Sequence, residues 1–273
     1  MQHGFTTDSI SWFDVSDVSR AALPVQLFEE GFDVWLGNNR GTRHSRKHQW
    51  LDADIHQEDY WDFSHHEYGA FDLPTMAKFI IGMREKEGAE CMKLNYLGHS
   101  LGTTQTFYGL GRGKYMRPYF SQVVAIAPCF VPMIDNYVSS DFKLDKETYA
   151  AITGFMEVLD LESLFGPYWG DQVDRLCGVS GGHHTEACKQ LKSVKVGPLA
   201  PGGSIFGMSE VSVQSVLHLA QNIVEQKFQY YEEAFFLNDL FGIEGKEIAL
   251  ESLTEPPFNF IYVDNDDVCD VET

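Results

Sequence analysis

The stretch LNYLGHSLGTTQTFYGL, residues Leu94–Leu110, takes the chain from an apolar run through a Gly-His-Ser-Leu-Gly turn into a helical pattern. Residues Gly98–Gly102 match Gly-x-Ser-x-Gly, the nucleophile elbow, in which a serine stands on a sharp turn between a strand and a helix. Glycines on either side let the strand and the helix approach each other closely. The turn predicts that Ser100 is a nucleophile; the alternative is a glycine-rich turn whose serine merely caps the helix.

Short apolar runs alternate with helical patterns along much of the chain. Strands are predicted where apolar runs are nearly continuous, as in strands covered on both faces, at Phe32–Gly37, Met92–Gly98, Val123–Cys129 and Phe258–Asp264. Helices are predicted directly after the serine turn and at Asp72–Gly88, which has a proline in its first turn and a glycine at its end. The pattern predicts an α/β fold with a mainly parallel sheet.

The alternation of strands and helices stops after Cys129 and resumes at Phe258. The residues in between contain helical patterns, notably Ser209–Phe228, and no convincing strand. We therefore expect residues 130–257 to form a helical cap, inserted into a core of residues 1–129 and 258–273 and placed over the carboxyl edge of the sheet.

The composition excludes several classes of partner. The 273 residues include 40 acidic and 20 basic ones, and the formal charge of −20 disfavours nucleic acid as a partner because it repels phosphates. No apolar run approaches the roughly 20 residues that a membrane span requires. The amino end lacks the charged start and apolar core of a signal peptide. No cofactor is indicated, and the oligomeric state stays open.

The five cysteines include no C-x-x-C pair, so they indicate no zinc or redox site. Cys177 and Cys188 lie close together in a loop-rich stretch, where either a local disulfide or two free thiols fits the sequence. Cys91 and Cys129 stand at the ends of predicted strands, where we expect buried structural cysteines.

A nucleophilic serine needs backbone donors for the oxyanion and an acid that orients its base. One donor should be the N–H of Leu101, at the start of the helix. The other normally lies in a loop introduced by His-Gly, and here His3-Gly4 makes Phe5 the matching donor. The acid should follow a strand beyond the cap. We select Asp266, with Asp267 as the alternative, from the four aspartates there, which are Asp264, Asp266, Asp267 and Asp270.

At these positions the chain resembles the acid lipase family, the gastric and lysosomal lipases with their fungal and plant steryl ester and triacylglycerol lipase relatives. The matching blocks are QHGFTTDSISW, GFDVWLGNNRGTRHSRKH (Gly31–His48, the most specific), YWDFSHHEYGAFDLPTMAKFI, YLGHSLGTTQ and GGSIFGMSEVSVQSVLHLAQNIVEQKFQYY. They run from residue 2 to about residue 270. The resemblance implies the α/β-hydrolase fold with a helical lid, and a serine ester hydrolase for neutral lipids, triacylglycerols or steryl esters, at an interface. It also suggests a secreted, lysosomal, vacuolar or lipid-droplet location.

The resemblance also assigns roles to residues. It implies that Ser100 is the nucleophile, that Phe5 and Leu101 are the oxyanion donors, and that Asp266 is the acid. His218, in the cap, is expected to be structural. The family usually has Gln where Leu101 stands, but only the backbone N–H is needed there. The basic residues of the most specific block are expected to pair with carboxylates rather than lipid headgroups; they are Arg40, Arg43, His44, Arg46 and Lys47.

Two parts of the family pattern are missing. The family's catalytic histidine follows the acid, whereas this chain has no histidine after His218. In the α/β-hydrolase sheet, the strand that delivers the His-Gly loop lies between those expected at Phe32–Gly37 and Met92–Gly98, and only two residues precede His3. We therefore expect a fragment of a longer lipase, with a gap in its sheet, that folds poorly and hydrolyses little. The alternative is a catalytically silent lipid-binding or scaffold relative that has lost its base.

No other histidine is a convincing base. His99 is the neighbour of the serine in the elbow, a position from which a side chain is expected to point away from the serine oxygen. His183 and His184 lie in the predicted cap, where recruiting either of them would need an unprecedented geometry.

Overall fold

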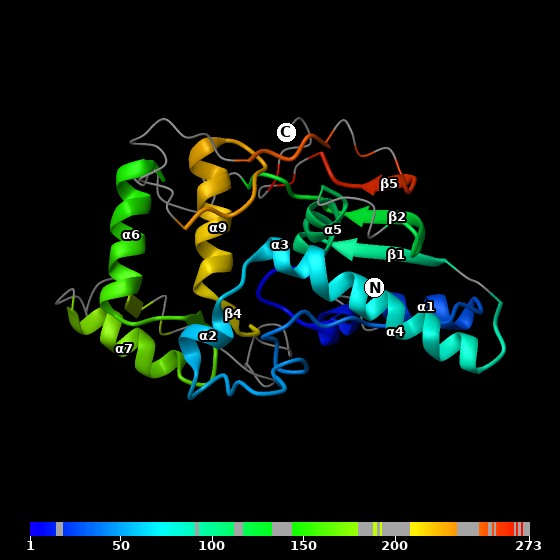
Figure 1. The fold of residues 1–273 in the computed structure, drawn as a ribbon, viewed down its shortest axis with the longest axis horizontal. Helices are drawn as coiled ribbons and strands as arrows, with labels where there is room; N and C mark the ends of the chain where they lie inside the picture. Colours follow the sequence, from blue (N-terminus) through cyan, green and yellow to red (C-terminus); the bar gives the residue numbers. More distant parts are fainter. Residues whose placement is uncertain are drawn as a thin grey trace.

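The computed structural model describes residues 1–14, 19–90, 93–111, 117–132, 144–179, 188–189, 192, 208–233, 246–250, 253, 255–264, 266 and 269. Two groups of elements lie side by side in Figure 1. One contains the three-stranded sheet with the helices α1, α4 and α5, and the other contains the helices α6, α7 and α9. In the part of the chain that is described, no helix is long and apolar enough to cross a bilayer.

The sheet is parallel and has the strand order β1 (Leu94–His99), β2 (Phe120–Ile126) and β5 (Phe258–Ile261). The central strand is β2: its residue Val123 pairs with Tyr96 on one side and with Phe258 on the other. The predicted mainly parallel sheet is confirmed. Because the strands are parallel, their carboxyl ends meet at one edge, which is the edge that carries the serine turn.

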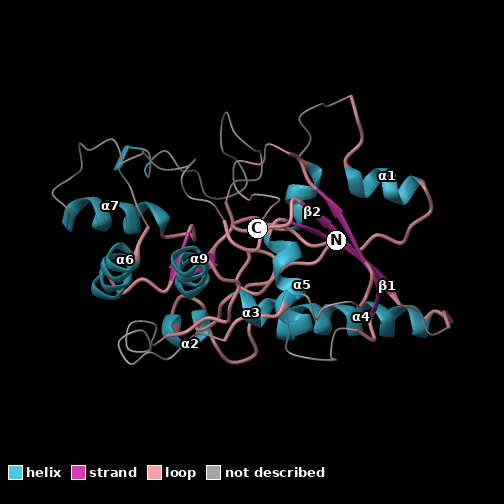
Figure 2. Ribbon diagram, turned by 90° about the horizontal axis from the view of Figure 1, so that it is seen from above, coloured by secondary structure: helices cyan, strands magenta, loops and turns pink. Residues whose placement is uncertain are grey.

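The helices around the sheet follow the predicted pattern. Helix α4 (Leu73–Lys86) has a proline in its first turn and directly follows the short helix α3 (His65–Glu67) and the π-helical turn η2 (Tyr68–Asp72). Helix α5 (Leu101–Gly111) follows the serine turn and is buried along nearly its whole length. In Figure 2, α1 (Leu23–Glu29) lies on one side of β1 and β2, and α4 lies on the other.

Two smaller elements lie between the amino terminus and α3. They are the 3-10 helix η1 (Ser9–Phe13), which packs against α1, and the helix α2 (Gln57–Trp61). The second group contains α6 (Lys146–Val158), α7 (Trp169–Val179) and α9 (Val213–Glu225), and α6 and α9 pack side by side (Figures 1 and 2).

The second group has its own apolar core, which includes Tyr149, Trp169, Val173 and Leu217. It also holds a two-residue antiparallel pair, β3 (Ser163–Leu164) and β4 (Val211–Ser212), so the expectation of a strand-free stretch was wrong. Two residues per strand are too few to produce a recognisable alternation in sequence. The cap boundaries at residues 130 and 257 stay a prediction.

The predicted strand Phe32–Gly37 was wrong, because only its last residue pairs in a sheet manner. Gly37 forms a bridge with Gln2, and Gln2 forms a second bridge with Gly98 of β1. The Met1 amine donates to Trp35 O at 2.7 Å, and the Gly37 N–H donates to Met1 O at 2.9 Å. Among the described residues, only Met1 and Gln2 pair with this segment, which explains why it does not become a strand.

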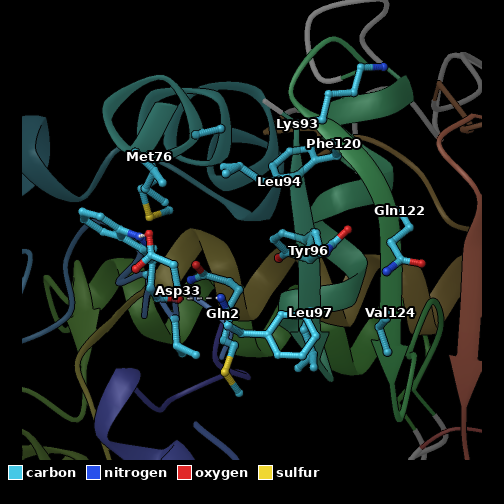
Figure 3. A pocket seen from close by; sticks show the side chains of 18 of the residues that line it. Gln2, Asp33, Met76, Lys93, Leu94, Tyr96, Leu97, Phe120, Gln122 and Val124 are labelled. Carbon is cyan, nitrogen blue, oxygen red and sulfur yellow. Dashed lines mark hydrogen bonds between the residues drawn. The ribbon is translucent and has the colours of Figure 1, made fainter. Parts of the chain in front are cut away.

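Beside Met1 and Gln2, the space between this segment and β1 is an apolar cavity of about 420 Å³ (Figure 3). Its lining includes Phe32, Trp35, Met76, Tyr96, Leu97 and Phe120. Gln2, which bridges to both Gly37 and Gly98, lies at one end of this cavity.

Two disulfides tie distant parts of the chain together. Cys177 and Cys188, for which the sequence left a disulfide and two free thiols open, form a disulfide. Cys129 is buried, as expected, but it is not a free thiol, because it pairs with Cys269 across a sequence separation of 140 residues. Cys91 lies outside the described residues.

Candidate active site

Ser100 stands at the junction of β1 and α5 in the conformation that a nucleophile elbow requires. Its φ angle is 51°, in the left-handed region that non-glycine residues rarely adopt. Its N–H donates to Ile126 O of β2 at 2.9 Å, and its carbonyl accepts from the Thr103 N–H at 2.8 Å. A serine that only caps a helix has an extended backbone, so the left-handed φ angle favours the elbow over the simple cap.

The two glycines of the elbow are required by close backbone contacts. A Cβ on Gly98 would lie 2.5 Å from Gly102 O, and a Cβ on Gly102 would lie 2.5 Å from Gln2 O. Both distances are far below a normal contact, so the backbone leaves no room for a side chain. The spacing Gly-x-Ser-x-Gly therefore reflects the packing of β1, α5 and the amino-terminal segment at one point.

The amino-terminal segment crosses directly over the elbow. The His99 N–H donates to Gln2 O at 3.1 Å. A Cβ on Gly4 would lie 3.3 Å from Ser100 Cβ, so the backbone of the His3-Gly4-Phe5 loop passes close to the serine. The sequence-based prediction of the N–H groups of Phe5 and Leu101 as oxyanion donors is compatible with this arrangement, because Leu101 directly follows the serine and Phe5 packs against the apolar cluster that contains Leu101.

A buried polar network fixes this loop. His3 Nδ1 donates to Gly4 O at 2.8 Å, and His3 Nε2 accepts from the Asn39 N–H at 3.2 Å. The Asn39 side chain accepts from Gln2 Nε2 and donates to Gln105 Oε1 of α5, each at 2.8 Å. Burial lowers the pKa of His3 to about 4, so its ring is neutral. Sequence reasoning missed Asn39 and Gln105, although Asn39 lies in the most specific family block.

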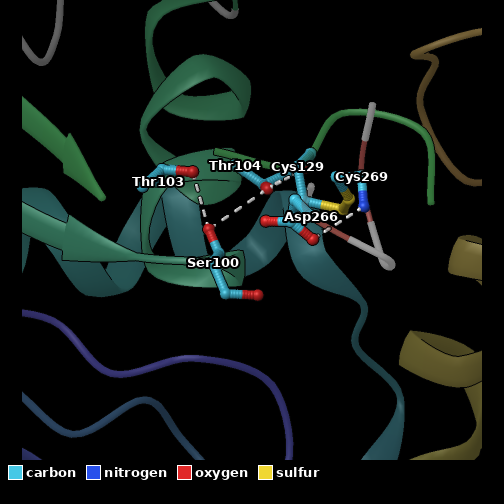
Figure 4. The surroundings of a disulfide bond; sticks show 6 residues. All are labelled: Ser100, Thr103, Thr104, Cys129, Asp266 and Cys269. Carbon is cyan, nitrogen blue, oxygen red and sulfur yellow. Dashed lines mark hydrogen bonds between the residues drawn. A yellow bond between two sulfur atoms is a disulfide. The ribbon is translucent and has the colours of Figure 1, made fainter. Parts of the chain in front are cut away.

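Asp266 lies in the loop after β5, close to the elbow (Figure 4). Its Oδ1 accepts from the Cys269 N–H at 3.1 Å. Burial lowers the pKa of His99, and the charge of Asp266 opposes this shift, so the carboxylate is within electrostatic reach of the residue beside Ser100. Asp267 and Asp270 lie outside the described residues.

The histidines of the helical groups are placed differently from a catalytic base. His218 of α9 is fully buried: its Nε2 lies 2.7 Å from Gln229 O and 2.9 Å from the Tyr108 hydroxyl, and its Nδ1 lies 3.2 Å from Ser64 Oγ. Burial lowers the pKa of His218 to about 3. These contacts are those of a structural residue, as expected. His183 and His184 lie outside the described residues.

A second buried histidine, His65 of α3, was not singled out by the sequence. Its ring stacks on the His218 ring with centroids 5.3 Å apart, and the Phe5 ring meets it edge-on at 5.4 Å. Neither ring nitrogen of His65 has a hydrogen-bond partner among the described residues. Burial holds the pKa of His65 well below its ordinary value. The ring therefore packs as a neutral aromatic group.

The three arginines of the block 31–48 are paired with carboxylates, as predicted, whereas His44 and Lys47 form no ion pair with a described residue. Arg40 binds Asp72 through Nε at 2.8 Å and Nη2 at 2.6 Å. Arg46 binds Asp54 at 2.9 and 2.6 Å and Glu210, which directly precedes β4, at 2.8 Å. A further pair joins Arg43 to the buried Asp8. The block thus ties the amino-terminal segment and the second helical group to the core.

Comparison with known proteins agrees with the fold and with the resemblance to lipases. Residues 1–161 match the alpha/beta hydrolase fold family. The human "Lysosomal acid lipase/cholesteryl ester hydrolase" is 30% identical over 243 residues, which are 85% of this chain and 57% of that protein. "Triacylglycerol lipase 2" of Arabidopsis thaliana is 41% identical over 85% of this chain and 53% of its own length.

A third relative, mouse "Lipase member M", is 29% identical over 82% of this chain and 51% of its own length. The chain thus spans about half the length of the curated relatives that it matches. Since the family match covers more than half of the chain and includes β1, the serine turn, α5 and β2, this chain belongs to the alpha/beta hydrolase fold family.

Proposed function

We propose that this chain carries the nucleophile, the oxyanion donors and the acid of a lipase, a serine ester hydrolase for neutral lipid esters. The observation that carries the proposal is the left-handed backbone of Ser100, with φ of 51°, between two glycines that cannot carry a side chain. A residue with a strained backbone persists only where the contacts around it hold it in that conformation. Such residues are concentrated at functional sites.

In the proposed reaction, Ser100 Oγ attacks the ester carbonyl and gives up its proton to a base. The carbonyl oxygen becomes an oxyanion that accepts hydrogen bonds from the backbone N–H groups of Phe5 and Leu101. Collapse of the tetrahedral intermediate breaks the ester bond, releases the alcohol with the proton from the base, and leaves an acyl-enzyme. Water then hydrolyses the acyl-enzyme and restores the serine. Asp266 is assigned the role of orienting the base.

The base itself is not assigned to any residue of this chain. In the acid lipase pattern it is a histidine after the acid, and these 273 residues contain none after His218. General-base catalysis contributes about 10²–10⁴-fold to the rate, so we expect the chain alone to react slowly. Neutral lipid esters are proposed as substrates because the relatives are named cholesteryl ester hydrolase and triacylglycerol lipase.

Covalent labelling tests the proposal. The purified chain is incubated with a fluorophosphonate, which phosphonylates activated serines, and the modified peptide is identified by mass spectrometry. We expect the label on Ser100 and its loss in Ser100→Ala, while Ser121→Ala, which removes an exposed serine of β2, should label like the wild type. A label that stays at full level in Ser100→Ala would contradict the proposal.

A second candidate function is favoured by the missing histidine alone. A relative that has lost its base can still bind neutral lipid without hydrolysing it. This reading predicts that fluorophosphonate does not label Ser100 even when imidazole is supplied as the base, while the chain still binds to a neutral-lipid emulsion. Labelling of Ser100 at any measurable rate decides against it.

A further inference from the structure

The disulfide between Cys129 and Cys269 lies next to the proposed catalytic serine and acid (Figure 4). We propose that it is a positioning element that holds Asp266 at the nucleophile elbow. This inference deepens the proposed function and rests on it, because it takes Asp266 as the acid. Cys129 follows the end of β2 by three residues, and Cys269 follows Asp266 by three residues.

One end of the disulfide is fixed to the same scaffold as Ser100. The last residue of β2, Ile126, accepts the hydrogen bond from the Ser100 N–H. Cys129 O accepts a hydrogen bond from the hydroxyl of Thr104, which lies in the first turn of α5 directly after the elbow. Cys129 is buried, with 8% of its surface exposed. Its position relative to the serine is therefore set by both the strand and the helix of the elbow.

The other end is fixed to the acid. The Cys269 N–H donates to Asp266 Oδ1 at 3.1 Å, so a displacement of Cys269 would displace the carboxylate or break this bond. Cys269 is also buried, with 4% of its surface exposed. The path from the nucleophile to the acid thus runs from the Ser100 N–H to Ile126 O, along the chain to Cys129, through the disulfide, and from the Cys269 N–H to the Asp266 carboxylate.

The strand that leads into the acid loop is short, and its end is exposed. The strand β5 is only four residues long and pairs with β2. The side chains of Ile261, Tyr262 and Val263, which lead into the loop, are 53–58% exposed. Segments with few buried contacts open at a low free-energy cost. Without the covalent link, we expect the loop to leave the elbow while the rest of the sheet persists.

The electrostatic coupling of Asp266 to His99 provides a readout that does not depend on catalysis. The charge of Asp266 opposes the lowering of the His99 pKa by burial. If the carboxylate moves away, the pKa of His99 falls further. A disulfide that merely stabilised the fold would leave this pKa unchanged in the folded protein.

The experiment compares two double variants of the full chain. Cys129→Ser with Cys269→Ser removes the disulfide beside the elbow, and Cys177→Ser with Cys188→Ser removes the other one as a matched control. The His99 pKa is measured by NMR titration of the labelled imidazole. We expect it to fall in the first variant, to match the wild type in the control, and to fall in Asp266→Asn, which removes the charge directly.

Fluorophosphonate labelling of Ser100 in the same proteins gives the second readout. With imidazole supplied as the base, we expect labelling to slow about 10- to 100-fold in the first variant, because Asp266 then no longer holds the base in position and a displacement of about 1 Å can cost that much. If the variant without the Cys129–Cys269 disulfide does not fold, the control with Cys177→Ser and Cys188→Ser is folded first and then mildly reduced. Reduction breaks the Cys129–Cys269 disulfide without a substitution at the site, and the same fall in the His99 pKa is expected.

A His99 pKa that stays at the wild-type value after loss of the Cys129–Cys269 link, while Asp266→Asn lowers it, would overturn the inference. If instead the His99 pKa falls but no protein is labelled at Ser100, the proposed function fails and the anchoring of Asp266 stands. The experiment thus gives different results for a wrong anchoring role of the disulfide and for a wrong catalytic role of Ser100.

Discussion

The geometry of the candidate site depends on the residue type at three positions of the serine turn, which are Gly98, Ser100 and Gly102. The serine holds a left-handed backbone, which costs an L-residue roughly 1–2 kcal/mol. The glycines give the space that the crossing of the amino-terminal segment, β1 and α5 requires. Each of these positions restricts the residue type through contacts with backbone atoms, which cannot move aside as a side chain does.

The close contacts of Gly102 predict a large effect of a single added methyl group. In Gly102→Ala the new methyl group would lie 2.5 Å from Gln2 O and 2.7 Å from His3 O. We expect a loss of about 3 kcal/mol in the free energy of unfolding, together with loss of Ser100 labelling because the His3-Gly4-Phe5 loop must move. Urea unfolding measures the first effect and fluorophosphonate the second.

The matched control is Gly82→Ala in α4, where an added Cβ meets no atom within 4 Å. There we expect a gain of about 1 kcal/mol, because alanine favours the helix over glycine. A Gly102→Ala protein as stable as the wild type would show that the amino-terminal segment does not lie against α5.

At the level of secondary-structure elements, the two sides of β1 differ. Strand β1 pairs with β2 along its whole length, whereas on its other side the described residues pair with it only through Gln2. Met1 donates to Trp35 O and accepts from Gly37, and Gln2 makes the equivalent contacts with Leu97 and His99. This is the hydrogen-bond pattern of a parallel ladder. The apolar cavity lies beside Met1 and Gln2, between residues 32–37 and β1.

A strand-forming extension tests this interpretation. Four apolar β-branched residues added before Met1 should enter the cavity and replace the buried terminal amine, whose pKa is lowered by burial to about 6, by a peptide N–H. Burial of about three side chains, offset by the entropy of ordering them, should raise the free energy of unfolding by roughly 1–3 kcal/mol. Thermal unfolding measures the gain. A Gly-Ser extension of equal length is the control, and equal melting temperatures for the two would refute the strand interpretation.

At the scale of the whole molecule, buried neutral histidines make stability depend on pH. Burial lowers the pKa of His3 to about 4 and of His218 to about 3, and holds that of His65 well below its ordinary value of 6.5. Below pH 6.5 the unfolded chain therefore binds more protons than the folded protein. The free energy of unfolding should be highest above pH 6.5 and should fall as the pH drops from there toward 4.

Each of these histidines contributes a slope of up to about 1.4 kcal/mol per pH unit, and urea unfolding at pH 7.5, 6.5 and 5.5 measures the sum. His65→Phe should reduce the slope and raise the stability, because phenylalanine keeps the ring contacts and removes two buried nitrogens without partners in the described structure. Trp50→Phe, at an exposed position without a titratable group, should leave the slope unchanged. An unchanged slope in His65→Phe would contradict the account.

The sequence predicts those features that local patterns encode. The elbow was predictable because its glycine spacing records a backbone contact, and the Cys177–Cys188 bond was a candidate because the two residues are 11 positions apart. The Cys129–Cys269 bond was not predictable, since a separation of 140 residues leaves no local trace. Phe32–Gly37 was mispredicted because an apolar run becomes a strand only where a partner pairs with it.

Chemical rescue of Ser100 tests the central claim most directly. The claim is that the elbow serine, its oxyanion loop and its acid are assembled in this chain, while the base is not. The measurement is the rate of fluorophosphonate labelling at increasing imidazole concentration, in wild type and in Ser100→Ala. We predict that imidazole accelerates labelling of Ser100 in proportion to its free-base form and has no effect on Ser100→Ala. A labelling rate that is independent of imidazole, whether it is fast or zero, would contradict the account.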